Sequence, residues 1–261
     1  MTPTRVAVVT GGGRGLGRAT ALRLAHDGMN VAVLARSQAE VEAVAEEVTA
    51  LGSQGLGLSV DITDTAAVEA ARAEVDACLG PVDVVINNAG SLLYKPFVPL
   101  PGREDASPGF DTAISDDEWQ GILGVHLGGA IRVLRAFGPA MLERRRGRVV
   151  NVVSNVVRRT YPFTVGYDTA KGALVQLTRS LAQEWGRYGV TVNAVAAGHF
   201  RTEMTREQFE DERVYKQMVR RVAMRRTGEL DEFAGLVSYL CSDSAGFVTG
   251  EVVGVDGGET L

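Results

Sequence analysis

The 261-residue sequence predicts an α/β fold in which helices cover both faces of a parallel sheet. Three observations lead to this prediction. Short apolar, β-branched segments alternate with longer amphipathic segments along the chain. A glycine-rich turn joins the first apolar segment to the first amphipathic one. No stretch rich in Pro, Gly or Ser divides the chain, so we expect one domain over residues 1–261.

The first half of the chain is expected to alternate strands with helices. Val6–Thr10 is short, apolar and β-branched, as in a buried strand, and the next strands repeat this character. The helices carry apolar stripes and end at Gly28, at Gly52 and at Gly80 with Pro81. In chain order the expected elements are strand 6–10, helix 15–28, strand 30–35, helix 38–51, strand 57–60, helix 64–79 and strand 82–87.

The second half continues the alternation with longer helices. A helix over 116–145 should end at the basic run Arg144–Arg148, where cations complement the helix dipole and Gly147 caps the helix. The elements expected after it are strand 148–153, helix 164–188, strand 191–195, helix 230–242 and strand 252–255.

Two segments interrupt the alternation. Residues 91–114 form a loop longer than most and follow the carboxyl end of a strand, where such sheets bind ligands. Its aromatic residues Tyr94, Phe97 and Phe110 either line a pocket, hold the loop to its own surface, or meet a partner subunit. Residues 199–228 are either an amphipathic helix pair or a lid over a substrate.

The composition is that of an ordinary soluble globular protein, and the net charge of −5 does not favour a nucleic-acid surface. No apolar run is long enough to span a bilayer, and no secretory leader pattern opens the chain. Cys78 and Cys241 have neither metal nor redox spacing, so we expect buried, reduced thiols in a cytoplasmic protein. The three histidines are too scattered to form a metal site.

The turn Thr10–Gly17 has the composition of a phosphate cradle. Its glycines allow a tight turn and a close approach of a pyrophosphate, which then lies at the N-terminus of the following helix. The turn stands between a strand and a helix, which is the context that dinucleotide binding requires. No carboxylate follows the second strand, whereas Arg36 there can pair with a 2′-phosphate, assisted by Arg14. The sequence therefore favours NADP, with NAD as the alternative.

Tyr167 and Lys171 lie four residues apart, on one face of an expected helix, and Ser154 lies thirteen residues before the tyrosine. An ammonium group about 4–5 Å from a phenol would lower its pKa from about 10 to roughly 7–8 at an effective dielectric of about 20. A phenol with that pKa exchanges protons at neutral pH. The structural alternatives are a satisfied buried tyrosine, a solvated lysine and a serine that bonds its own loop.

Together these motifs resemble the short-chain dehydrogenase/reductase family over nearly the whole chain. The resemblance rests on Thr10–Gly17, Asp61, Asn87–Gly90, Ser154, Tyr167 with Lys171, Asn193, and Ala197–Gly198 followed by Thr202. It implies a single Rossmann-type, doubly wound domain whose seven parallel strands are ordered 3-2-1-4-5-6-7. It also implies a homotetramer or homodimer with the Tyr167 helix at an interface, although core packing explains the Leu174–Trp185 stripe equally well.

The resemblance also implies where a cofactor binds: Asp61 and Ile62 near the adenine, Asn88 along the channel, and Thr202 near the nicotinamide carboxamide. The expected cofactor-binding residues are Gly11, Arg14, Gly15, Leu16, Gly17, Arg36, Asp61, Ile62, Asn88, Ala89, Gly90, Tyr167, Lys171, Gly198 and Thr202.

The activity implied is NADP(H)-dependent interconversion of a ketone or aldehyde with an alcohol. Ser154 and Tyr167 would donate to the carbonyl oxygen while hydride moves from the cofactor to the carbonyl carbon and Tyr167 gives up its proton. Lys171 would lower the pKa of Tyr167 and bond the ribose. His126 stands where the family has an asparagine that helps to hold a relay water, so it is either a fourth catalytic residue or a packing histidine.

The sequence leaves three further points open. Ala197 replaces the proline that the family commonly has before Gly198, which loosens a turn near the nicotinamide but removes no reacting group. A non-redox enzyme, such as a lyase or epimerase, and a cofactor-binding regulatory protein are alternatives on the same fold. The identity of the small-molecule substrate is not readable, and neither a membrane nor a nucleic acid is expected as a partner.

Overall fold

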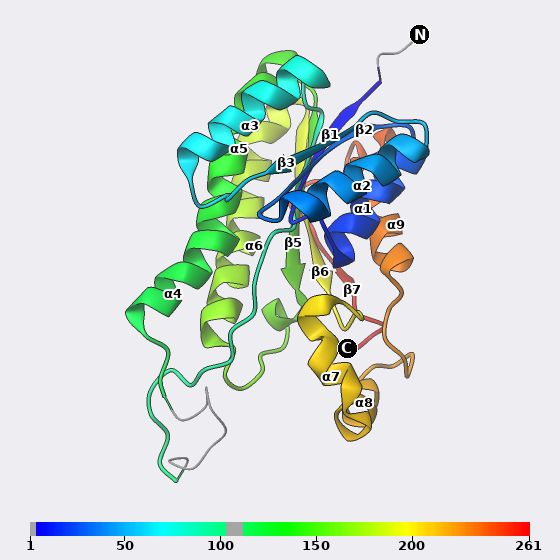
Figure 1. Cartoon of the computed structure of the whole chain (residues 1–261). Coiled ribbons are helices and arrows are strands. Elements are labelled where there is room, and N and C mark those ends of the chain that lie inside the picture. The colour runs from blue at the N-terminus through cyan, green and yellow to red at the C-terminus, as the bar shows by residue number, and fades with distance from the viewer. Residues whose placement is uncertain (1–3, 103–111) are drawn as a thin grey trace.

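A computed structural model describes residues 4–102 and 112–261 of the chain. In this part of the chain, seven parallel strands form one sheet in the order β3-β2-β1-β4-β5-β6-β7, as predicted (Figure 1). The strands are β1 Val6–Thr10, β2 Asn30–Ala35, β3 Gly55–Ser59, β4 Val84–Asn87, β5 Gly147–Ser154, β6 Val190–Ala197 and β7 Val252–Val255. The strand order reverses between β1 and β4, which creates a ligand-binding crevice at their carboxyl ends.

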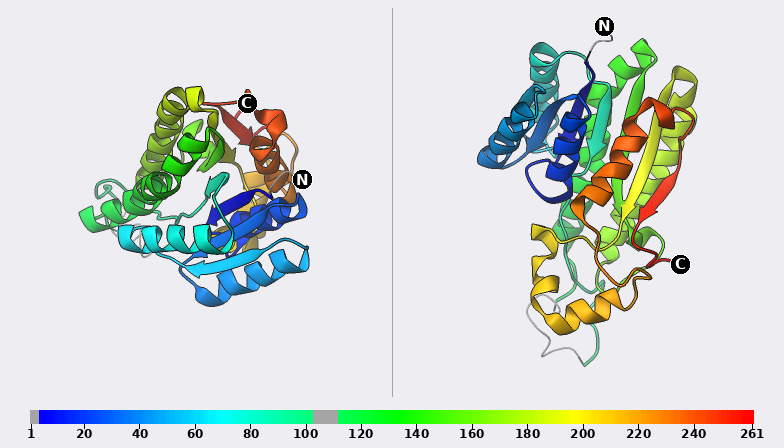
Figure 2. Two further views of the ribbon diagram at one scale, coloured as in Figure 1. Left: turned by 90° about the horizontal axis from the view of Figure 1, so that it is seen from above. Right: turned by 90° about the vertical axis from the view of Figure 1, so that its right-hand side faces the viewer.

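Helices cover both faces of this sheet (Figure 2). On one face lie α1 (Gly15–His26), α2 (Gln38–Ala50) and α9 (Leu230–Cys241), and on the other α3 (Thr65–Cys78), α5 (Ala130–Arg144) and α6 (Val165–Trp185). Alternate residues of β1 point to the two faces, so Ala7 and Val9 pack in one core and Val6 and Val8 in the other. This double burial explains why the strands are continuous apolar runs.

The predicted long helix 116–145 is interrupted. α4 (Asp116–Leu123) passes into a π-helical turn, Gly124–Gly129, before α5 begins. Glycines there have low helix propensity, and a Cβ on Gly129 would lie 2.4 Å from Ile62 Cδ1. The prediction that Gly147 caps the helix is also wrong. Arg145 takes the left-handed conformation instead, at φ 54°, while Gly147 begins β5.

The two irregular segments lie at the carboxyl edge of the sheet. In the 91–114 segment, Phe97 packs edge-on against Trp119 of α4, with ring centres 6.1 Å apart, and Lys95 pairs with Glu118 at 2.8 Å. Phe97 therefore ties this segment to the protein's own surface, whereas Tyr94 lines the cavity described below. Phe110 lies outside the described residues. The 199–228 segment folds into α7 (Arg206–Glu210) and α8 (Glu212–Val219), which project beyond the sheet (Figure 2).

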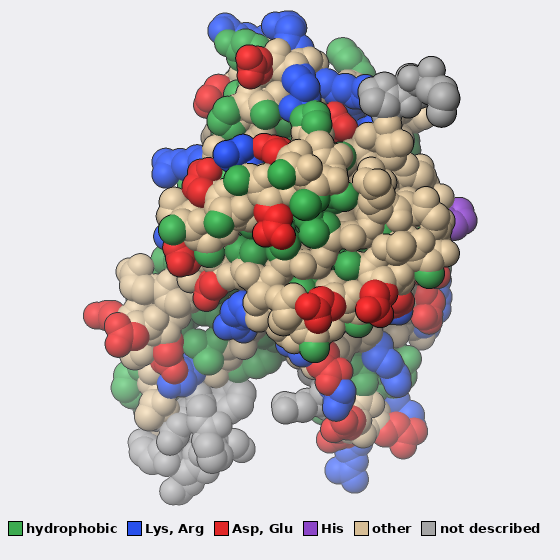
Figure 3. Space-filling view, turned by 45° about the horizontal axis from the view of Figure 1, so that its top comes forward, with side chains coloured by type: hydrophobic (Ala, Val, Ile, Leu, Met, Phe, Trp, Pro, Cys, Tyr) green, Lys and Arg blue, Asp and Glu red, His purple; other side chains and the backbone are tan. Residues whose placement is uncertain are grey.

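Cys241 is buried, as predicted, but Cys78 is exposed at the end of α3, so the prediction of two buried thiols is wrong for that residue. Within 4–102 and 112–261, no group of His, Cys, Asp and Glu side chains could hold a metal ion. In the same residues, none of the helices combines the length and apolar character needed to cross a membrane. Basic and acidic side chains are interspersed on the face seen in Figure 3.

Candidate active site

A cavity of about 1370 Å³ opens at the carboxyl edge of the sheet. Figure 3 shows the surface hollowed between the side that carries α4 and the side that carries α7 and α8. Pockets for a single small ligand typically measure about 300–1,000 Å³, so this cavity has room for a dinucleotide and a substrate together. Its walls come from the segments that follow β1 to β6, and from parts of α4, the π-helical turn, α6 and α8.

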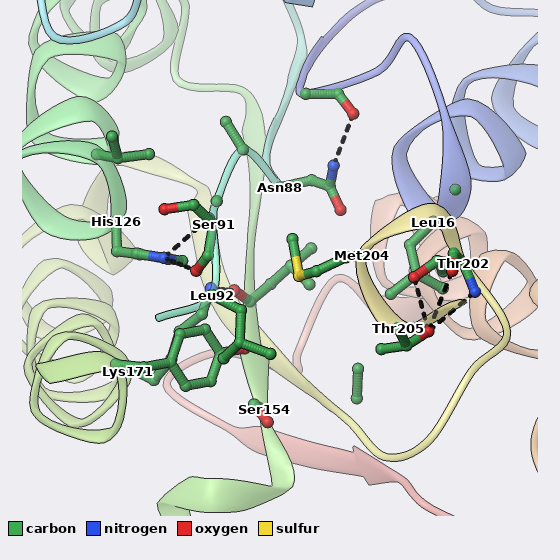
Figure 4. Close-up of a pocket in the computed structure, with 18 of the residues that line it drawn as sticks. Leu16, Asn88, Ser91, Leu92, His126, Ser154, Lys171, Thr202, Met204 and Thr205 are labelled. Carbon is green, nitrogen blue, oxygen red and sulfur yellow. Dashed lines mark hydrogen bonds between the residues drawn. The ribbon is translucent and has the colours of Figure 1, made fainter. Parts of the chain in front are cut away.

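The β1–α1 turn forms one end of the cavity. Gly11 and Gly15 line it with φ angles of +61° and +56°, which side chains rarely adopt. Gly17 lies behind them, where a Cβ would fall 2.2 Å from the Gly11 carbonyl oxygen. Asn88 holds the turn from β4, because its Nδ2 donates to the carbonyl oxygens of Thr10 (3.1 Å) and Gly11 (3.0 Å) (Figure 4). This narrow cradle at a helix N-terminus fits a pyrophosphate.

The predicted adenosine-side residues also line the cavity. Asp61 accepts hydrogen bonds from the backbone nitrogen (2.8 Å) and the hydroxyl (2.7 Å) of Thr63. These bonds lower the pKa of Asp61, and the nearby Arg36 charge adds to the effect, whereas burial opposes it. Glu40, which the sequence reasoning missed, reaches the same wall and lies 3.8 Å from Arg14. Ser37 caps α2 by accepting from the Glu40 backbone nitrogen, and a glutamate at this spacing is typical of a helix start, so the local sequence carries no sign of a role in the cavity. Of the other predicted cofactor residues, the cavity wall includes Leu16, Ile62, Ala89, Gly90, Gly198 and Thr202.

Ser154, Tyr167 and Lys171 meet in the middle of the cavity. Ser154 ends β5, and the first turns of α6 carry the other two. The Lys171 side chain is buried; its Nζ lies 5.6 Å from the centre of the Tyr167 ring and donates to the Val152 carbonyl oxygen at 2.7 Å. Ser154 lies near the Tyr167 phenol and favours its ionised form. The structure thus brings the three predicted catalytic residues together.

The expected low pKa of Tyr167 is wrong for the chain by itself. Burial raises the pKa of Tyr167 to about 12, although Ser154 acts in the opposite direction. Burial also lowers the pKa of Lys171 to about 7, so this ammonium loses much of its charge near neutral pH. The prediction counted the attraction between the two groups and omitted the cost of removing both from water.

His126 projects from the π-helical turn toward the segment after β4 (Figure 4). Its Nε2 lies 2.8 Å from the carbonyl oxygen and 3.1 Å from the backbone nitrogen of Ser91, so either tautomer finds a partner there. Its ring meets the Tyr167 ring edge-on at 5.2 Å. Burial, together with the Lys171 charge, lowers the pKa of His126 to about 3, so the imidazole is neutral. Its buried Nδ1 has no partner among the described residues.

Beyond Ser154 the cavity ends in a polar cluster that the sequence reasoning missed, formed by Asn155, Tyr161, His199 and Glu259. The buried Glu259 carboxylate accepts hydrogen bonds from the other three side chains. These partners lie 60 to 104 residues away along the chain, so no local sequence signal could have grouped them.

The 199–228 segment lines the cavity on the side opposite Ser91 (Figure 4). Met204 and Met218 line it, and the Met204 side chain extends into it (Figure 4). Thr205 fixes Thr202, because the Thr205 hydroxyl lies 3.0 Å from the Thr202 backbone nitrogen and 3.0 Å from the Thr202 hydroxyl. The Arg201 guanidinium lies over the Phe209 ring, with its carbon 5.0 Å from the ring centre.

Comparison with known proteins agrees with this geometry. A family model described as enoyl-(acyl carrier protein) reductase matches residues 11–260. The chain belongs to the short-chain dehydrogenase/reductase family. It is 34% identical to the 3-oxoacyl-[acyl-carrier-protein] reductase FabG of Staphylococcus aureus, over 99% of both chains.

Two solved structures are similar over nearly their whole length. The gluconate 5-dehydrogenase of Burkholderia cenocepacia, in complex with NADP and tartrate, superimposes with a TM-score of 0.88 at 30% identity, covering 99% of this chain and 96% of its own. An actinorhodin polyketide ketoreductase with NADPH gives 0.89 at 31% identity, covering 98% of this chain and 97% of its own. The chain is therefore a short-chain, NAD(P)-dependent oxidoreductase.

Proposed function

We propose that this protein is an NADP(H)-dependent reductase that interconverts a ketone or aldehyde with an alcohol. The observation that carries the proposal is one continuous cavity, with the glycine cradle and Arg36 at one end and Ser154, Tyr167 and Lys171 in the middle. A non-redox enzyme on this fold has no need of an open dinucleotide cradle, which argues against a lyase or epimerase.

Arg36 and Arg14 support NADP rather than NAD. Both line the cavity, and a guanidinium matches the geometry of a phosphate. The Arg14–Glu40 pair is long, at 3.8 Å, and its side chains are 64% and 39% exposed, so it contributes little stability and Arg14 is free to exchange partners. The NADP and NADPH named with the two similar structures are consistent with this assignment.

Bound nicotinamide supplies the hydride, and the protein supplies the proton and the oxygen-binding donors. Tyr167, with a pKa of about 12, carries its proton at neutral pH and serves as the acid toward a carbonyl oxygen. Ser154 is the second donor, and Lys171 is close enough to stabilise the charge left on the phenol. His126 packs against Tyr167 and supports its ring. The relay role predicted for His126 would use its unpartnered Nδ1.

The assembly as a homotetramer or homodimer and the cytoplasmic location stay predictions. Leu174 and Trp185 pack within the protein's own core, as the core-packing alternative predicts, which leaves the interface on α6 without specific support.

The proposal is tested by following absorbance at 340 nm with NADPH and NADH. The substrates are 3-oxoacyl thioesters, simple ketones and aldehydes, with the corresponding alcohols for the reverse reaction. We expect NADPH oxidation with a carbonyl compound, at a higher kcat/KM than with NADH. Tight binding of NADPH with no turnover of any of these compounds would favour a cofactor-binding regulatory protein.

A further inference from the structure

His199 lies at the same edge of the sheet as Ser154. It follows β6 by two residues, and Ala197 at the end of β6 pairs in register with Ser154 at the end of β5. Paired strands lie about 4.8 Å apart and an extended residue spans at most about 3.6 Å, so the Cα atoms of His199 and Ser154 are no more than about 12 Å apart. Both residues line the same cavity, so one small molecule can reach both side chains.

The Glu259 carboxylate holds the His199 ring. The Glu259 side chain is fully buried, and its Oε1 lies 3.1 Å from His199 Nε2. Burial raises the pKa of Glu259, but the hydrogen bonds from His199 and Tyr161 outweigh it and lower the pKa overall, so the group is ionised at neutral pH. An ionised carboxylate only accepts hydrogen bonds, so the proton in this bond belongs to His199 Nε2. The Tyr161 ring meets the His199 ring edge-on, with centres 6.3 Å apart, and limits its rotation.

The other members of the cluster use their polar atoms on one another. The Tyr161 hydroxyl donates to Glu259 Oε1 (2.6 Å), and Asn155 Nδ2 donates to Glu259 Oε2 (2.7 Å) and to the Tyr161 oxygen (3.2 Å). Asn155 Oδ1 accepts from the Ser154 hydroxyl at 3.1 Å. His199 is bonded through Nε2, and its Nδ1 has no partner among the described residues. The His199 side chain is 20% exposed in the cavity wall, so its Nδ1 is the atom that this cluster offers to a ligand.

A hydroxyl group matches this nitrogen in either protonation state of the ring. Neutral imidazole with its proton on Nε2 has a lone pair at Nδ1, whereas the imidazolium has an N–H there, and a hydroxyl group can donate to the first and accept from the second. A carboxylate only accepts, and it would bring a second negative charge to the ring that Glu259 already holds. A hydrocarbon group would bury Nδ1 without any partner, which is unfavourable.

We propose that His199 is a specificity-determining residue whose Nδ1 binds a hydroxyl group carried by the carbonyl substrate. This inference rests on the proposed function and narrows its substrate class to hydroxy ketones and hydroxy aldehydes. The substrate carbonyl then lies at Ser154 and Tyr167 and the hydroxyl group at His199, which takes no part in the transfer of hydride or proton. Loss of His199 should therefore lower the selectivity for hydroxylated substrates and leave the reduction of plain ketones nearly unchanged.

The test compares kcat/KM for matched ketones with and without a hydroxyl group, followed as NADPH oxidation. The pairs are 1-hydroxy-2-butanone and 4-hydroxy-2-butanone against 2-butanone, and 5-hydroxy-2-pentanone against 2-pentanone, which vary the distance between hydroxyl and carbonyl. We expect the wild type to prefer at least one hydroxy ketone to its parent. In His199→Phe, which keeps a ring and removes both nitrogens, this ratio should fall about tenfold, the effect of one lost hydrogen bond. The kcat/KM values of the parent ketones should change less than about threefold.

The matched control is His26→Phe, at an exposed histidine of α1, which should keep the wild-type ratio. An unchanged ratio in His199→Phe, or a wild type with no preference for any hydroxy ketone, would overturn the inference. A wild type that prefers levulinate to 5-hydroxy-2-pentanone would also overturn it and would assign recognition to the exposed Arg221 of the cavity wall. Failure to oxidise NADPH with any carbonyl compound would instead refute the proposed function, and the inference with it.

A readout that needs neither turnover nor a folded His199→Phe is the nitrogen NMR signal of His199 Nδ1 in the wild-type protein with bound NADPH. The chain has three histidines, so His26→Phe and His126→Asn identify the signals of the other two. The diol product of the preferred hydroxy ketone cannot react with NADPH, and at saturation it should shift the Nδ1 signal. The alcohol product of the parent ketone should leave the signal in place. An equal response to both alcohols, or no response to the diol, would contradict binding of the hydroxyl group at His199.

Discussion

Lys171 should make the stability of the protein rise with pH in a range where most lysines have no effect. Its folded-state pKa is about 7, lowered from 10.5 by burial. Between these values the unfolded chain binds more protons at this position than the folded chain. Because stability rises with pH wherever the unfolded state binds more protons, neutral Lys171 favours the folded state increasingly above pH 7.

The size of this effect follows from the two pKa values. At pH 7 about half of the folded molecules carry the Lys171 proton, and at pH 8.5 about 3% do, while the unfolded chain remains protonated throughout. Integrating this difference gives a gain of about 2 kcal/mol in the free energy of unfolding between the two pH values. Burial raises the pKa of Cys241 from 9.0 to about 12, so this thiol lowers the free energy of unfolding as the pH rises. The effect begins only as the pH approaches 9, the usual pKa of a thiol.

The assay is urea unfolding at fixed protein concentration, without cofactor, for the wild type and Lys171→Met at pH 7, 7.5, 8 and 8.5. Subtracting the two curves cancels the titration of all other groups that the substitution leaves unaffected. We expect the free energy of unfolding of the wild type to rise by about 2 kcal/mol relative to that of the variant over this range. Parallel curves would show that Lys171 keeps an ordinary pKa in the folded protein and would refute the reasoning.

Three further outcomes are expected. Arg36→Asp should reduce the preference for NADPH over NADH in kcat/KM at least about tenfold, through loss of a charge-assisted phosphate contact; an unchanged preference would exclude Arg36 as the 2′-phosphate ligand. Gly90→Ala should lower the melting temperature, because the added Cβ would lie 2.4 Å from His126 Cε1. In a His126→Ala background the same substitution should lower the melting temperature much less. An equal decrease in both backgrounds would contradict this contact. Native protein should react rapidly with a thiol reagent at Cys78 alone, and at Cys241 only after unfolding; two fast thiols would be inconsistent with the described burial.

The sequence was a good guide to elements whose character is local. The bounds of β1, β2 and β7 were predicted to the residue, and the strand order follows from the resemblance. Continuous apolar strands and glycine-ended helices carry their signal within a few residues. The same holds for Tyr167 and Lys171, whose spacing of four fixes them on one helix face.

Features that depend on the surroundings were not predictable in this way. The pKa of Tyr167 depends on how deeply the fold buries it, and the π-helical turn depends on contacts such as that of Gly129 with Ile62. Glu259 gave no signal at all, since it meets Asn155 only after the sheet has assembled.

The most direct test of the central claim, that the Tyr167 hydroxyl protonates the carbonyl oxygen, is the single-turnover rate of NADPH oxidation by Tyr167→Phe with saturating carbonyl substrate. The substitution removes one oxygen and keeps the ring that packs against His126. We expect the rate to fall by about 10²–10⁴-fold, as for loss of a general acid, with the Kd for NADPH within about twofold of the wild type. A single-turnover rate close to that of the wild type would contradict the claim.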